Sequence, residues 1–107
     1  GKDSIVIRAD GHGVPEILDA ILTLLPLDTY TEKPVGLMQV VPGDTCGRPE
    51  IWDTYEEILS KHEPEHHDIE FIERFDFYER AKGAYLIIAT GEGAIYANVL
   101  LKKGVVK

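Results

Sequence analysis

The sequence predicts an α/β fold, a three-layer α/β/α sandwich around a mainly parallel (mixed) central sheet. Short apolar runs of strand length alternate with amphipathic runs of helical period along the whole chain. The run at 34–41 is almost wholly apolar, which is typical of a strand that is covered on both faces. The 107 residues contain no internal repeat and no low-complexity tract, so we expect a single domain over residues 1–107.

The first elements follow from their turn residues. Residues 4–8 have the β-branched composition of a strand, and the glycine-rich residues 9–13 end it. Pro15 stands where the first turn of a helix favours proline. An apolar stripe of helical spacing then continues until Pro26, and the apolar strand at 34–41 follows.

The second half repeats the alternation. A helix is expected to begin near Pro49, because apolar residues recur from there at helical spacing. A polar linker broken by Pro64 separates this helix from the next strand. The remaining expected elements are a strand at 69–73, a short amphipathic helix at 74–82, and strands at 85–89 and 98–102.

Composition excludes several classes of function. The chain has 11 basic and 19 acidic residues, a formal net charge of −8, and no basic patch interleaved with aromatic residues, so nucleic acid is not an expected partner. No apolar run approaches the length of a membrane span, and no signal peptide precedes the first strand. The lone Cys46 cannot form an internal disulfide and fits a reducing, cytoplasmic location.

Two motif interpretations are weak. The glycine-rich stretches at 10–13 and 91–96 lack the spacing of phosphate-binding loops, and a strand rather than a helix is expected after the second, so no nucleotide cofactor is predicted. His62, His66 and His67 form a polar run that Pro64 interrupts, which favours a solvated loop over a metal site. We therefore predict neither a cofactor nor a metal.

The best candidate site lies near the C-terminus. A glycine-framed loop leads into Tyr96 and Asn98, which are two residues apart and would project from one face of an extended backbone. A phenol and a carboxamide can donate to and accept from hydroxyl groups without carrying charge. This pair suits a polyol ligand better than a phosphate or a metal.

Arg74 and Tyr78 form a second candidate pair, one helical turn apart and directly after an expected strand. Arg74 could donate to ligand oxygens and Tyr78 could offer a phenol or a stacking face. The alternative, an exposed helix with no ligand, is equally compatible with the spacing. Asp28 follows a proline that ends a helix and would by default cap a turn, whereas Met38 on its apolar strand would by default be core.

Four segments together resemble a known family: IRADG at 7–11, LPLDTY at 25–30, RFDFYERAK at 74–82, and TGE, YAN and LKKG within 90–104. They are similar to the L-fucose mutarotase branch of the family that also contains D-ribose pyranase. The aromatic residues Phe75, Phe77 and Tyr78 favour the fucose branch. The likeness covers essentially the whole chain, in order and with compatible gaps.

This resemblance implies an isomerase that interconverts the α and β anomers of L-fucose without a cofactor, in a layered α/β protein that assembles into homo-oligomeric rings, commonly decamers. Tyr78 and Tyr96 would be the catalytic residues of this chain. A non-catalytic monosaccharide-binding accessory to uptake and a D-ribose pyranase are the alternatives. The sugar contacts that the resemblance implies are Asp28, Met38, Arg74, Tyr78, Tyr96, Ala97 and Asn98.

The resemblance has one clear departure. Family members carry an N-terminal helix and strand with a Gly-His-Gly-Asp-Glu motif, followed by an Ala-Asp pair. The histidine of that motif is the proton donor of the family, and the aspartate of the pair binds substrate. Neither residue is present in this chain, because His12 lies in a different place in the pattern. We therefore expect the 107 residues to be a fragment that lacks the histidine-bearing segment.

Overall fold

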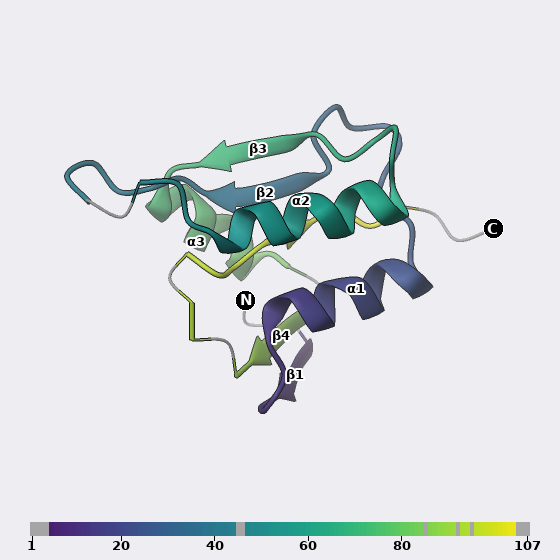
Figure 1. Cartoon of the computed structure of the whole chain (residues 1–107), viewed down its shortest axis with the longest axis horizontal. Coiled ribbons are helices and arrows are strands. Elements are labelled where there is room, and N and C mark those ends of the chain that lie inside the picture. Colours follow the sequence, from purple (N-terminus) through teal and green to yellow (C-terminus); the bar gives the residue numbers. More distant parts are fainter. Residues whose placement is uncertain (1–4, 45–46, 85, 92, 95, 105–107) are drawn as a thin grey trace.

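The computed structural model describes residues 5–44, 47–84, 86–91, 93–94 and 96–104. Strands and helices alternate along the chain (Figure 1), which confirms the predicted α/β class. No helix in these ranges is long and apolar enough to cross a membrane. The elements are β1 (Ile5–Ala9), α1 (Val14–Leu24), β2 (Val35–Met38), α2 (Ile51–His62), β3 (Ile69–Ile72), α3 (Arg74–Lys82), β4 (Leu86–Thr90) and β5 (Leu100–Leu101).

The strands form two sheets. β2 is the centre of a three-stranded mixed sheet, parallel to β3 on one edge and antiparallel to β5 on the other. β1 and β4 form a separate parallel pair. Both edges of β2 are occupied, so the mixed sheet is as expected but β1 and β4 pair with each other rather than joining it.

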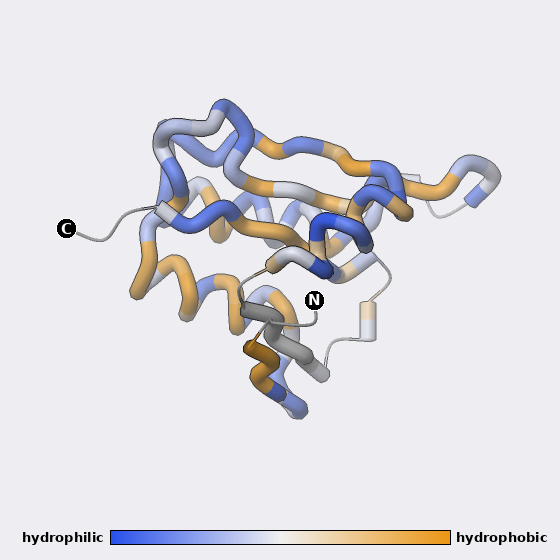
Figure 2. The backbone as a smooth tube through the Cα atoms, turned by 180° about the vertical axis from the view of Figure 1, so that it is seen from behind, coloured by the Kyte–Doolittle hydropathy of each residue, from blue (hydrophilic) through white to orange (hydrophobic). Residues whose placement is uncertain are grey.

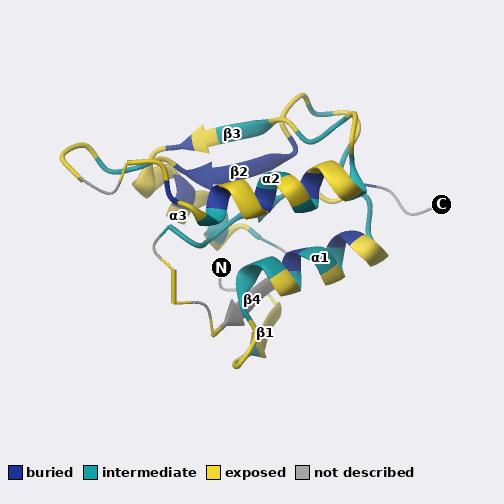
Figure 3. Cartoon of the chain, in the orientation of Figure 1, coloured by how far each residue is buried: buried dark blue, intermediate teal, exposed yellow. Residues whose placement is uncertain are grey.

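The sheet that contains β2 is the middle of three layers. Successive side chains of β2 point to opposite faces of this sheet, so they contact a different layer on each side. Val35 and Leu37 pack against residues of α1 and α2, whereas Met38 packs against Ile72 and Phe77 on the α3 side. Figure 3 shows β2 as a buried strand behind α2. The first core cluster consists of Leu18, Leu22, Leu27, Val35, Leu37, Trp52, Tyr55 and Leu59.

β1 differs from β2 although both are apolar. Ile5, Val6 and Ile7 are 49%, 59% and 47% exposed. At the lower end of the molecule, β1 is coloured as hydrophobic in Figure 2 and as exposed in Figure 3. Hydrophobic sequence alone therefore does not distinguish the covered strand from the exposed one.

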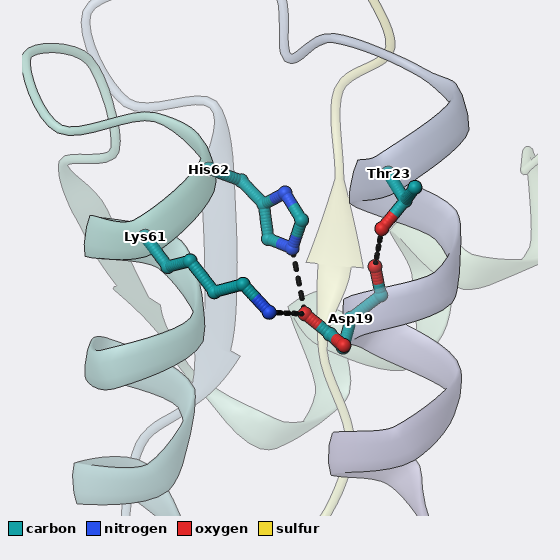
Figure 4. Close-up of polar contacts among 4 residues, drawn as sticks. All are labelled: Asp19, Thr23, Lys61 and His62. Carbon is teal, nitrogen blue, oxygen red and sulfur yellow. Dashed lines mark hydrogen bonds and ion pairs between the residues drawn. The ribbon is translucent and has the colours of Figure 1, made fainter.

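A polar cluster joins the two helices on the front of the sheet (Figure 4). Asp19 of α1 accepts hydrogen bonds at Oδ1 from Lys61 Nζ (3.1 Å) and faces His62 Nε2 at 2.6 Å. These two contacts lower the pKa of the Asp19 carboxyl, and the His62 hydrogen bond is the larger cause. The side chain of Thr23 donates to the Asp19 carbonyl oxygen at 2.8 Å.

The other two histidines of this region also have partners in the chain. His66 Nε2 lies 2.7 Å from the Thr31 carbonyl oxygen, and His67 Nδ1 contacts the Glu63 carbonyl oxygen. All three rings are partly buried, so they are less exposed than a fully solvated loop would leave them. The physical reason is that their ring nitrogens satisfy, or are satisfied by, local backbone and carboxylate groups.

Candidate functional site

A shallow pocket of about 150 Å³ lies where the parallel strands β2 and β3 end. Its lining comes from the segment after β2 and from the start of α3: Gln39, Val40, Val41, Pro42, Glu73, Arg74 and Phe75. Ligands of α/β sheets bind at the carboxyl ends of the strands, so the pocket stands where the predicted site belongs. The strand expected at 34–41 ends at Met38, which frees residues 39–42 to form this wall.

Glu73 fixes the start of α3 and thereby the place of Arg74. Its carboxylate accepts hydrogen bonds from the backbone N–H groups of Phe75 (2.8 Å) and Asp76 (3.0 Å) at the helix N-terminus. Arg74 is then the first residue of the helix, with its guanidinium 4.8 Å from the Phe75 ring centre. An exposed cation and an aromatic face thus stand together at the mouth of the pocket.

Tyr96 does not line the pocket, but its phenol contacts the backbone of Val41, which does. Its hydroxyl oxygen accepts a hydrogen bond from the Val41 N–H (2.9 Å), and its O–H donates to Asp44 Oδ2 (2.8 Å). Its single proton is directed to Asp44. Tyr96 therefore meets a sugar hydroxyl only as a hydrogen-bond acceptor while that bond lasts.

The extended backbone expected at Tyr96 is wrong. Tyr96 has a φ of +55°, the left-handed conformation that non-glycine residues rarely adopt. The expected strand at 98–102 is accordingly reduced to Leu100–Leu101. The turn brings the phenol to Val41. Tyr96 and Asn98 therefore do not project from one face of a strand, contrary to the sequence prediction.

Asn98 and Ala97 follow Tyr96 and are half-buried. The side-chain oxygen of Asn98 is buried and has no hydrogen-bond partner among the described residues. An unsatisfied buried acceptor costs about 1–3 kcal/mol, so it marks a place for a donor such as water or a ligand hydroxyl. This supports a polar role for Asn98.

Tyr78 and Met38 differ in how far they are buried. Tyr78 is half-exposed on α3, one turn after Arg74, and its ring packs edge-on against Phe77 with 6.5 Å between centroids. Met38 is only 5% exposed and belongs to the core cluster with Ile72 and Phe77. Met38 is therefore a core residue next to the segment that lines the pocket, as its apolar strand predicts.

Asp28 lies at the opposite end of the sheet. Its N–H donates to the Lys102 carbonyl oxygen (2.8 Å), and Lys102 in turn pairs with Pro34 at the beginning of β2. Its carboxylate accepts the Tyr30 N–H (3.0 Å), the turn-capping role that the sequence predicts by default. A Cβ at Gly104 would lie 2.5 Å from the Leu27 carbonyl oxygen, so only glycine allows this close approach.

The structure thus places Arg74 in the pocket lining and Tyr96 next to it, hydrogen-bonded to the lining residue Val41. Tyr78 lies one helical turn after Arg74, and Ala97 and Asn98 follow Tyr96 in the chain, whereas Asp28 lies apart. The sequence interpretation missed Asp44, whose carboxylate orients the Tyr96 phenol. The available signal was the Pro42-Gly43 dipeptide, which is typical of a tight turn; Gly43 has a φ of +90°. Cys46 lies outside the described residues.

The molecule is thus an α/β protein with a candidate pocket at the carboxyl ends of β2 and β3. Its lining combines the cation of Arg74, the carboxylate of Glu73, the ring of Phe75, the carboxamide of Gln39 and the apolar residues 40–42. The RbsD / FucU transport protein family matches residues 2–106. The chain belongs to that family.

Curated relatives point to one branch of it. The human protein named fucose mutarotase is 50% identical over 101 residues, which covers 92% of this chain and 65% of the relative. The L-fucose mutarotase of Actinobacillus pleuropneumoniae serotype 5b is 46% identical over 102 residues, which covers 95% of this chain and 70% of the relative. The chain therefore spans about two thirds of the length of these relatives.

Solved structures agree. FucU from Bifidobacterium longum superposes with a TM-score of 0.92 at 56% identity, which covers 100% of this chain and 75% of that one. The Streptococcus pneumoniae fucose mutarotase, solved in complex with L-fucose, has a TM-score of 0.88 at 48% identity and covers 96% and 72%. Bacillus subtilis RbsD, solved with D-ribose, shares the fold with a TM-score of 0.70 at 20% identity.

Proposed function

We propose that this chain is part of an L-fucose mutarotase, an isomerase that interconverts the α and β anomers of the free sugar. The observation that supports it most is a pocket lined by Arg74 and by Val41, whose N–H binds the Tyr96 hydroxyl, in a chain 50% identical to the human protein named fucose mutarotase. The neighbour solved with L-fucose adds support for this sugar.

The proposed reaction is a pair of proton transfers. The anomeric hydroxyl loses a proton while the ring oxygen gains one, the ring opens to the aldehyde, and closure on the other face reverses both steps. Apart from the O–H bonds that exchange protons, only the ring C–O bond is broken, and the sugar is neither oxidised nor reduced. Neither a redox nor a metal cofactor is therefore required.

The residues have different parts in this proposal. Arg74 donates hydrogen bonds to sugar oxygens and holds them in register, which lowers the entropic cost of the reaction. Tyr78 is half-exposed and supplies an O–H that can protonate or polarise an oxygen. Tyr96 accepts from a sugar hydroxyl, because its own proton goes to Asp44. Asn98 contributes its carboxamide and Ala97 its backbone.

NMR saturation transfer between the α and β anomers of L-fucose tests the proposal with the complete polypeptide at neutral pH. We expect faster exchange than in buffer, and a fall of about 100-fold in Tyr78→Phe, in the range that a positioned acid contributes. Lys82→Gln is a control on the same helix, because Lys82 is exposed at the end of α3 and does not line the pocket. Unchanged exchange on adding the wild-type protein would rule out catalysis.

A non-catalytic sugar-binding function is the second candidate. None of the chain's four histidines, all of which are described, lines the pocket, and the Tyr96 proton is held by Asp44. This candidate predicts saturable L-fucose binding with no faster exchange and no effect of Tyr96→Phe on any rate. D-ribose pyranase activity is a further alternative, and the same assay with D-ribose decides it.

We also propose that the protein is a homo-oligomer, with a decamer as the expected size, and that it is cytoplasmic. Asp28 and Arg74 lie at opposite ends of one sheet, so a single chain does not bring them to one sugar. Copies arranged in a ring would place the Asp28 end of one against the Arg74 end of the next. Native mass spectrometry checks this arrangement, and a monomer that binds L-fucose at full affinity would contradict it.

A further inference from the structure

A second pocket lies at the other end of the three-stranded sheet, on the face that α3 covers. It encloses about 200 Å³ between β2, β3, β5 and the end of α3. Its floor is apolar and includes Gly36, Ile72 and Leu100. A Cβ at Gly36 would lie 2.7 Å from Ile72 Cδ1 and 3.4 Å from Leu100 Cβ, so the glycine lets these side chains close the floor.

The rim of this pocket is cationic in an acidic chain. Lys33, Arg80 and Lys102 line it together with one carboxylate, Glu70, which gives a local formal charge of +2 (three positive, one negative) against −8 for the whole chain. The Arg80 guanidinium forms a bidentate pair with Glu70, at 2.8 Å and 2.9 Å. The fold therefore places three cationic side chains together at this pocket, although the chain as a whole is acidic.

The three cations act on the same place. The pKa of Glu70 is lowered first by its hydrogen bond to Arg80 and further by the charges of Lys102 and Lys33. Glu70 neutralises one of them, so two positive charges remain for a ligand. Of the five N–H groups of Arg80, two are directed to Glu70, and the guanidinium retains donors in the planar arrangement that matches phosphate oxygens.

We propose that this pocket binds a small phosphate ester, with the phosphate held by Lys33, Arg80 and Lys102 and a compact apolar part resting on the floor around Gly36. A phosphate monoester carries close to two negative charges at neutral pH and balances the local charge. A carboxylate carries one and matches it less well. Within one chain the site lies at the opposite end of the sheet from the Arg74 pocket, so the two pockets share no lining residue.

Amide chemical shifts of the complete polypeptide test the proposal, with phenyl phosphate, inorganic phosphate and benzoate as probes. We expect saturable shifts at Lys33, Arg80 and Lys102 with both phosphates, additional shifts at Gly36 and Leu100 with phenyl phosphate alone, and weaker binding of benzoate. The dissociation constants should rise with salt, because the attraction is between charges.

Two variants separate this site from general attraction to lysines. The Lys33→Gln/Lys102→Gln double variant should weaken phenyl phosphate binding at least tenfold. Lys103→Gln is the matched control, because Lys103 is the next residue of the chain but does not line the pocket, and binding should stay within twofold. Equal losses in both variants, or no saturable shift in the wild type, would overturn the proposal.

A parallel L-fucose titration keeps the two sites distinct. The double variant should retain the wild-type amide shifts with L-fucose at residues 39–41 and Arg74. If the wild type shows no shift there with L-fucose but still binds phenyl phosphate, the proposed function fails and the phosphate site stands.

Discussion

The two sheets of this molecule contain strands of similar apolar composition, but the strands differ in how far their side chains are buried. β2 (VGLM) and β1 (IVIRA) are both apolar strands in parallel pairs. Val35 of β2 is 1% exposed and Val6 of β1 is 59% exposed. The difference lies in the layers, because helices cover both faces of β2. The candidate site belongs to the covered sheet, whose rigidity holds Arg74 and Tyr96 in place.

The largest expected effect is a matched pair of substitutions in the two strands. Val35→Ala should lower the free energy of unfolding by about 2–3 kcal/mol, from lost burial and the cavity left behind. Val6→Ala should change it by less than about 0.5 kcal/mol, since the side chain is mostly exposed. Urea unfolding measures both, and equal losses would show that β1 is covered in solution.

The covered sheet should also govern the chemistry. In Asp44→Ala the Tyr96 hydroxyl loses the acceptor of its proton, so we expect about a tenfold fall in anomer exchange, equivalent to about 1.4 kcal/mol. If Asp44 only orients the phenol, exchange at saturating L-fucose should fall more than sugar affinity. Asp10→Ala is the control at the end of β1. An unchanged rate in Asp44→Ala would exclude this orienting role.

The cap of α3 tests how firmly the site is anchored to that sheet. Glu73→Ala removes the acceptor of two helix N–H groups and should cost about 1 kcal/mol of stability. Because Arg74 is the next residue, affinity for L-fucose should fall as well. Glu73→Asn, which can still cap, should restore most of both. Thermal unfolding and a sugar titration of the two variants provide the measurement.

The smallest expected effect is at the contact between α1 and α2. The lowered pKa of Asp19 means that its contribution to stability is present above the ordinary carboxylate range, near pH 4, and is lost as the pH falls through the folded value. Asp19→Asn should therefore lose less stability than wild type between pH 5 and 3. Thr23→Ala, which leaves the carboxylate in place, should keep the wild-type slope.

Periodicity and turn residues predicted the α/β class, the order of the elements and α3 in full, because each depends on local pattern. They did not predict that β1 and β4 would pair apart from β2, since pairing depends on which edges are already occupied. At the site, Arg74 was predictable from its place after a strand. The left-handed Tyr96 and its bonds to Val41 and Asp44 were not, because they join residues more than fifty positions apart.

Gly104 has a consequence for the far end of the molecule. Because Gly104 has no Cβ, its backbone can pack directly against the backbone of Leu27 and Asp28. Any larger residue at this position would clash with Leu27 and displace the segment that bears Asp28. The position of the most distant predicted sugar contact therefore depends on a glycine near the other end of the chain.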